Sequence, residues 1–149
     1  MPGVIDTLSR LDFTSLREAS FAYVDCYELI EAPAVRAVDA ARAAGVPLLA
    51  NLGGSLLGPA VARALRAHPR LIVQTNVDDA AYADASPLAA SLLAATSAAW
   101  VVVTAGPFGA TAMSPAQELT IPAFRAAVRH THCAGAAFSG GLIYGLLQG

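Results

Sequence analysis

Short apolar runs alternate with longer, alanine-rich stretches along this chain. The runs Phe21–Asp25, Val46–Ala50 and Leu71–Gln74 are bounded by turn-forming residues, as buried β-strands are. Between them, Ala34–Ala44 and Leu57–Ala67 have the length and composition of helices. This alternation predicts βαβ units, and therefore a mostly parallel sheet that helices cover on both faces.

The pattern changes in the second half of the chain. Trp100–Thr104 is the strongest predicted strand, and Gly106–Gly109 predicts a turn directly after it. Pro33 and Gly45 mark the two ends of the first long helix. The remaining predicted elements are a short helix from Asn76 or Asp78 to Tyr82, a helix at Pro87–Ala95, a small antiparallel pair at Ala110–Met113 and Glu118–Pro122, a loop at Thr131–Gly135 and a helix at Ala136–Leu147.

Composition places the chain among folded, single-domain proteins. It has 149 residues, of which 56% are hydrophobic and 13% charged, a balance that excludes a disordered chain. We expect one domain over residues 1–149, because no repeat or linker interrupts it. The net charge of −2 argues against nucleic-acid binding. All basic residues are arginines, so a phosphate-binding loop that needs a GK pair is excluded.

The uncharged span Ala85–Gln117 raises the question of a membrane segment. Pro87, Gly106 and Pro107 interrupt it, whereas a spanning helix needs about 20 consecutive apolar residues. The first residues form no signal peptide, and two cysteines make no disulfide framework. We therefore expect a cytoplasmic protein that does not bind membranes.

Small residues gather at Ala134–Ala137, just before the last apolar helix. Backbone N–H groups there can approach an anion closely, and the helix dipole adds roughly half a positive charge. Arg125 and Arg129 lie just upstream. Close packing of a helix on a sheet explains the same small residues equally well, so the pattern alone leaves both interpretations open.

Three ordered segments together resemble the PfkB (ribokinase-like) family of carbohydrate kinases. Asn76-Val-Asp-Asp79 is similar to the family's NxxE box, and Val103-Thr-Ala-Gly-Pro-Phe-Gly109 is similar to its VTxGxxG segment. Thr131–Gly141 is similar to its DTxGAGDxFxGG signature, with His130 in the place of the leading aspartate. The resemblance covers nearly the whole chain.

The resemblance implies a three-layer α/β/α ribokinase-like fold and transfer of the γ-phosphoryl group of ATP to a sugar or similar alcohol. Such transfer depends on positioning, charge stabilisation and a base. ATP or ADP with Mg²⁺ would be bound, without a direct metal ligand, by an anion hole and by residues beside the nucleotide. By resemblance these are Cys133, Ala134, Gly135 and Ala136 in the anion hole, Thr104, Gly106 and Gly109 against the nucleotide, and Asn76 and Asp79, the latter through Mg²⁺-bound water.

The chain departs from the family at functional positions. Ala136 stands where the family has its catalytic aspartate, and a methyl group cannot accept a proton. Cys133 replaces a turn glycine, and Asp79 replaces a glutamate. The half that binds the acceptor and forms the lid has no counterpart, so the fold is expected to be truncated relative to the family. We expect impaired catalysis, retained nucleotide or phosphate binding, and a homodimer or partner chain that covers the exposed apolar surface.

Alternative functions remain. His132 or Cys133 could supply a substitute base, or a partner chain could complete the enzyme. His130, His132 and Cys133 together could instead bind a metal, although no second ligand cluster is evident. The chain could also be an interaction module without catalysis. Cys133 is expected to be a small, half-buried side chain if it has no chemical role.

Polar residues follow two of the predicted strands. Asp25, Cys26 and Tyr27 come after the first strand, where they either contact a ligand or lie in a surface loop. Asn51 follows the second, and the glycine pair after it is a weak candidate for a cradle of N–H groups. His68 ends an alanine-rich helix and is predicted to face solvent.

Overall fold

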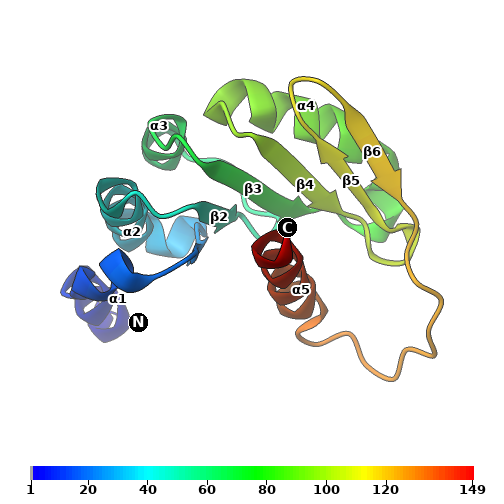
Figure 1. Cartoon of the computed structure of the whole chain (residues 1–149). Coiled ribbons are helices and arrows are strands. Elements are labelled where there is room, and N and C mark those ends of the chain that lie inside the picture. The colour runs from blue at the N-terminus through cyan, green and yellow to red at the C-terminus, as the bar shows by residue number, and fades with distance from the viewer. Residues whose placement is uncertain (1) are drawn as a thin grey trace.

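The chain folds around one mixed sheet of six strands in the order β1-β2-β3-β4-β5-β6 (Figure 1). The structure is a computed structural model that describes residues 2–149. The strands are β1 Ala22–Asp25, β2 Leu48–Asn51, β3 Leu71–Asn76, β4 Trp100–Thr104, β5 Ala110–Met113 and β6 Glu118–Ile121. β1 to β4 pair in parallel, and β5 and β6 add an antiparallel hairpin at one edge.

Helices lie on both faces of the sheet. The α-helices are α1 Pro2–Ser9, α2 Glu31–Ala44, α3 Pro59–Arg66, α4 Ala85–Thr96 and α5 Ala134–Gln148. Short 3₁₀ helices are η1 Thr14–Glu18, η2 Glu28–Ile30, η3 Asp79–Asp84 and η4 Gly106–Phe108. Figure 1 shows α2, α3 and α4 on one side of the sheet and α5 on the other. Among residues 2–149, no helix has the length and apolar run that crossing a bilayer requires.

The main core lies between the sheet and the helices α2, α3 and α4. Alternate strand residues point to one face, so Ala50, Val73 and Val101 stand in register on neighbouring strands of this core. Val38 of α2 and Leu65 of α3 pack on them without exposed surface. Burying an aliphatic side chain of this size stabilises the fold by about 1.5–3 kcal/mol.

The second face of the sheet carries α5 alone. Gln74 points to this face, opposite to Val73, and its Oε1 accepts a 3.0 Å hydrogen bond from Ser139 Oγ. Ser139 is the one buried residue of α5 in the part of the chain that the structure describes. The helix is therefore attached to the sheet by a polar contact rather than by a broad apolar seam.

Most of the predicted elements are confirmed, with small shifts in their ends. Trp100–Thr104 and Ala110–Met113 have the predicted bounds, and Gly45 ends α2 in the left-handed conformation with φ 69°. α2 begins three residues before the predicted start and α5 two residues before it, at Ala134. The predictions missed α1 and the 3₁₀ helices η1 and η2. Single-turn 3₁₀ segments are too short to show a helical period.

The prediction that His68 faces solvent is wrong. His68 is 4% exposed and lies two residues beyond the end of α3. The Arg70 backbone N–H donates to Nδ1 at 3.3 Å, and Nε2 has no partner among the described residues. Burial lowers the pKa of His68, and the charges of Arg42 and Arg70 lower it further, while the Val46 backbone acts in the opposite sense.

The lowered pKa of His68 predicts acid destabilisation. The folded state binds the proton more weakly than the unfolded chain, whose histidine pKa is about 6.5. Stability from the neutral imidazole is therefore present above that pH and is lost as the pH falls through it toward the folded pKa. In urea titrations at neutral and mildly acid pH, the wild type should lose more unfolding free energy than His68→Leu. His130→Leu, at an exposed position, should behave as the wild type; equal losses in all three proteins would contradict this.

Candidate functional site

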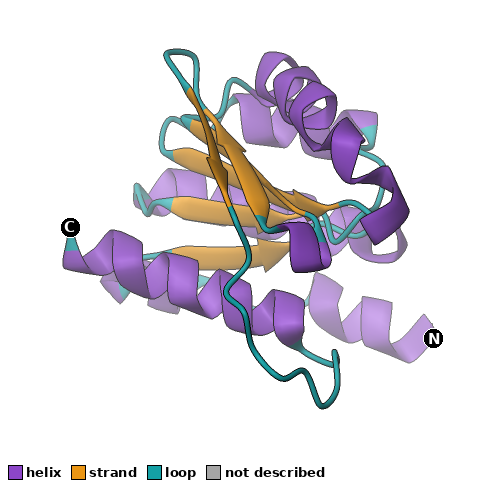
Figure 2. Cartoon of the chain, turned by 90° about the vertical axis from the view of Figure 1, so that its right-hand side faces the viewer, coloured by secondary structure: helices purple, strands orange, loops and turns teal. Residues whose placement is uncertain are grey.

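Parallel pairing brings the carboxyl ends of four strands to one edge of the sheet. Asp25, Asn51, Asn76 and Thr104 are the last residues of β1, β2, β3 and β4. Ligands of open α/β sheets bind at this edge. α5 runs in the direction opposite to β1–β4, so its N-terminus lies on the side of the sheet where these strands end (Figure 2).

The NxxE-like and VTxGxxG-like segments meet at this edge. The Val77 N–H donates to the Thr104 carbonyl at 2.9 Å. The Asp79 carboxylate lies directly against Gly106, whose φ is +51°, and a Cβ at residue 106 would overlap Asp79 Oδ1. Sequence similarity alone suggested that these residues act together, and the fold places them side by side.

An aromatic pair and a close backbone contact lie beside the contact between Asp79 and Gly106. Tyr82 and Phe108 stack with their ring centroids 4.3 Å apart. Gly109 has φ +95°, and a Cβ there would overlap the Ile121 carbonyl of β6. Packing against β6 is thus a sufficient reason for glycine at 109, without any contact to a nucleotide.

The segment 130–137 is exposed and starts α5. Cys133 has φ +62°, in the left-handed region where glycine is favoured. The Ala137 N–H donates to the Cys133 carbonyl, whereas the N–H groups of Gly135 and Ala136 have no acceptor among the described residues. These two groups are free to bind an anion. No hydrogen bond of the described residues joins this segment to Asn76–Asp79 or to residues 103–109.

The metal-binding alternative for His130, His132 and Cys133 receives no support from geometry. In residues 2–149, no group of three or more His, Cys, Asp or Glu side chains is arranged to hold a metal ion. Cys133 is exposed, so the expectation of a half-buried side chain is wrong. The long connection from β6 carries this segment along the outside of the fold (Figure 2).

Tyr23, Asp25, Tyr27 and Asn51 form a polar cluster at the ends of β1 and β2, whose contacts the sequence did not predict. Asn51 Nδ2 donates to Tyr23 Oη at 2.8 Å, to Asp25 Oδ1 at 2.9 Å and to Tyr27 Oη at 3.2 Å. The Tyr23 hydroxyl donates to Asp25 Oδ1 at 2.8 Å. Burial, together with the neighbouring Asp25, raises the pKa of Tyr23 and raises that of Tyr27 to about 12. Both phenols therefore stay protonated at neutral pH.

The glycine pair after β2 does not offer a free cradle. The Gly53 N–H donates to Asn51 Oδ1 at 3.1 Å, and the Gly54 N–H donates to Thr75 Oγ1 at 3.2 Å. Both donors are already used inside the protein. This weak candidate from the sequence is therefore wrong, because the neighbouring side chains satisfy the backbone.

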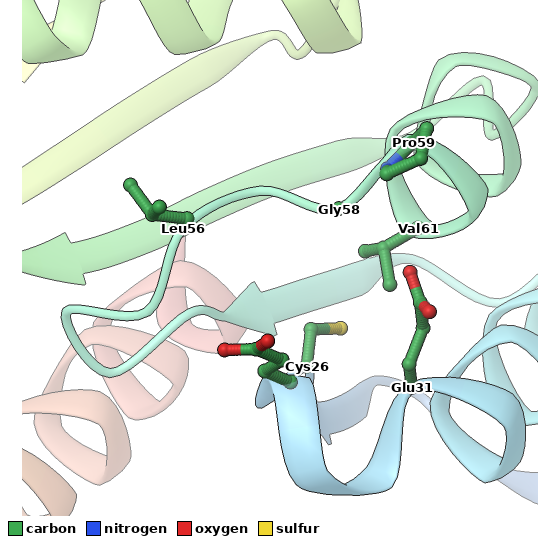
Figure 3. Close-up of a pocket in the computed structure, with 7 residues that line it drawn as sticks. Cys26, Glu31, Leu56, Gly58, Pro59 and Val61 are labelled. Carbon is green, nitrogen blue, oxygen red and sulfur yellow. The ribbon is translucent and has the colours of Figure 1, made fainter.

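A pocket of about 200 Å³ lies behind the same edge, between η2, the start of α2 and the loop before α3 (Figure 3). Glu28 and Glu31 line it together with apolar side chains and the Cys26 thiol. Burial, and then the charge of Asp25, raises the pKa of Cys26 to about 12. The thiol is protonated at neutral pH, and the two carboxylates make the pocket unsuited to a phosphate.

No protein-family model and no curated protein matches the sequence. Solved structures do match. A fructokinase from Xylella fastidiosa with bound ATP aligns with TM-score 0.69 and 18% identity, over 95% of this chain and 48% of that chain. Ribokinase from Arabidopsis thaliana, complexed with ribose and ATP, aligns with TM-score 0.73 and 18% identity, over 93% of this chain and 46% of that chain.

A PfkB protein from Polaromonas is also similar, with TM-score 0.63 and 21% identity over 95% of this chain and 51% of that chain. The fold is ribokinase-like. The chain spans about half the length of the kinases it matches. The expected fold class, with its mostly parallel sheet between helices, is confirmed.

The contact between Gly106 and Asp79 predicts a large effect of a small substitution. Gly106→Ala places a Cβ on the carboxylate in a backbone conformation that alanine disfavours, so it should lower the unfolding free energy by roughly 1–3 kcal/mol. Gly140→Ala is the matched control, because that helical position is open and alanine should stabilise it by about 0.5–1 kcal/mol. Urea titration measures both. Equal stability of the two variants would contradict the backbone strain expected of a side chain at residue 106.

Proposed function

We propose that this chain binds the phosphates of Mg²⁺-bound ATP or ADP at the carboxyl edge of its sheet, as the nucleotide side of a PfkB-like kinase fold. The observation that carries the proposal is the contact of Asp79 with Gly106, which joins two of the three family-like segments at this edge. The third begins a helix whose N-terminus points to the same side.

The residues present suit such a ligand. The free N–H groups of Gly135 and Ala136 are donors for phosphate oxygens at the positive end of α5. Arg125 and Arg129 add positive charge in the exposed segment upstream. Mg²⁺ usually keeps several waters and takes one or two carboxylates besides the phosphates. Asp79 can fill that role through bound water, so a preformed cage of protein ligands is not needed.

Residue 136 limits what the chain can do with the nucleotide. An alanine methyl group cannot take the proton of an acceptor hydroxyl, and general-base catalysis contributes about 10²–10⁴-fold. Binding of the nucleotide is therefore the primary function that we propose. Any phosphoryl transfer, slower than in an intact family site, depends on a proton acceptor elsewhere on the edge.

Nucleotide binding should be measurable as thermal stabilisation. A ligand at about 100 times its Kd adds about 2.7 kcal/mol, which corresponds to a rise in Tm of roughly 5–10 °C at this size. Gly135→Glu puts a carboxylate into open space beside the free N–H groups and should abolish the shift with Mg·ADP. Gly140→Glu, further along α5 and also in open space, is the control and should keep it. Loss of the shift in both variants, or no shift in the wild type, would contradict the proposed site.

We further propose that a second copy or a partner chain covers the outer side of α5. Tyr144 and Leu147 lie one turn apart on this helix, with 67% and 50% of their surface exposed. Exposed apolar side chains that neighbour one another are typical of interaction sites.

Sedimentation velocity at micromolar concentration tests this surface. The wild type should sediment as a dimer or larger species, and Tyr144→Lys should shift it toward the monomer because a charge replaces apolar contact. Leu29→Lys, at an isolated exposed position in η2, is the control and should not change the distribution. A purely monomeric wild type rules out self-association through α5.

A further inference from the structure

The first turn of α5 and the polar cluster at the end of β1 face each other. Ala136 and Ser139 are three residues apart on α5 and so lie on the same side of the helix. Ser139 faces the sheet, since it is 3% exposed and bonds to Gln74 of β3. The methyl group of Ala136 is therefore directed to the side on which the sheet lies.

A chain of contacts leads from that turn to a carboxylate. Ser139 Oγ also donates to the Gly135 carbonyl at 2.9 Å, within the first turn of α5. Gln74, the other acceptor of Ser139, pairs in register with Asn51 of β2, and Asn51 pairs in register with Asp25 of β1. The Tyr23 hydroxyl donates to Asp25 Oδ1 at 2.8 Å. Asp25 thus lies two strands from Gln74, on the face of the sheet to which α5 is bonded.

Neutral groups hold the Asp25 carboxylate in place. Asn51 Nδ2 donates to Oδ1 at 2.9 Å and fixes both tyrosine hydroxyls, while its own oxygen is held by the Gly53 N–H. Among residues 2–149, the ion pairs are those of Asp6 and Asp39, and neither involves Asp25. The carboxylate is half-buried at the ligand-binding edge, oriented by donors and not neutralised by an arginine.

We propose that Asp25 is the proton acceptor of this chain in phosphoryl transfer, taking the place of the carboxylate that residue 136 lacks. Tyr23 and Asn51 are its positioning residues. The assignment rests on the proposed binding of Mg·ATP at the same edge and names the group that would make this binding productive.

The step balances without any further reactant. Asp25 takes the proton of an acceptor alcohol, whose oxygen forms a bond to the γ-phosphorus. The bond between that phosphorus and the β,γ-bridging oxygen breaks, and ADP leaves with the electron pair. Asp25 then returns its proton to water, and no group is oxidised or reduced.

Asp25→Asn is the central variant, since an amide oxygen can still accept from Tyr23 but cannot take up a proton at neutral pH. With Mg·ATP and D-ribose, D-fructose, inosine or water as acceptor, turnover by this variant should fall by about 10²–10⁴-fold. Asp39→Asn, in a surface ion pair on α2, is the matched control and should keep wild-type turnover.

A carboxylate introduced at residue 136 tests whether turnover needs a proton acceptor at this edge of the sheet. In the Asp25→Asn background, Ala136→Asp returns a carboxylate to the same side of the first turn of α5 and should restore turnover. Carboxyl ¹³C NMR gives a readout that does not depend on turnover. The Asp25 signal, identified by its loss in Asp25→Asn, should move when D-ribose is added to the complex with Mg²⁺ and a non-hydrolysable ATP analogue.

The outcomes distinguish a failure of the Asp25 assignment from a failure of the proposed nucleotide binding. If Mg·ADP does not raise the Tm of the wild type, the binding proposal fails. If Mg·ADP stabilises the wild type and Asp25→Asn equally, binding stands. With binding intact, the Asp25 assignment is overturned if Asp25→Asn is as fast as Asp39→Asn, if wild-type turnover is at background with every acceptor, or if the Asp25 signal does not move.

Discussion

Parallel hydrogen bonding between β1, β2, β3 and β4 places the last residue of each strand at one edge of the sheet. The connections that contain α2, α3 and α4 all lie on one face of the sheet and bury that face under a continuous apolar core. Polar residues that are spread over the first 104 positions of the chain are thereby collected along a single line. The stable core and the candidate site are two consequences of the same strand pairing.

Much weaker contacts attach α5 to the opposite face of the sheet. α5 returns to it after a long exposed connection and buries Ser139 against Gln74. A buried hydrogen bond of this kind contributes about 0.5–1.5 kcal/mol, less than one well-packed aliphatic side chain. The turn proposed to bind an anion is therefore on a helix whose one buried residue, in the described part of the chain, is Ser139, and several apolar side chains of α5 remain exposed. Binding of a phosphate at the first turn and covering of α5 would each stabilise its position on the sheet.

The residue that lacks a carboxylate, on α5, and the carboxylate proposed to replace it, on β1, belong to the same edge of the fold. The family-like signature of the chain has an alanine at 136, but the helix that carries it faces a carboxylate held by Tyr23 and Asn51. The acidic pocket behind the edge, lined by Glu28, Glu31 and Cys26, has the wrong charge for the phosphates. Charge thus divides the edge into a part suited to an anion near α5 and a part that repels one near α2.

The sequence by itself determined the order and type of the main elements. Apolar period and turn residues located all six strands within two residues at each end, and also the helices that cover the core, because burial demands a regular pattern along the chain. β3 was predicted too short because Thr75 and Asn76 are polar. Resemblance of the three ordered segments also predicted the ribokinase-like fold, which the solved structures confirm.

Only the tertiary structure decided which side chains meet. Asp25 and Asn51 are 26 positions apart, and nothing in local periodicity shows that one amide joins Asp25 to two tyrosines. His68 follows an alanine-rich helix with two arginines in its last turn, yet its side chain is 4% exposed. Local patterns report how each segment meets solvent or core, whereas a site depends on distances between segments, which are fixed when strands pair and helices pack.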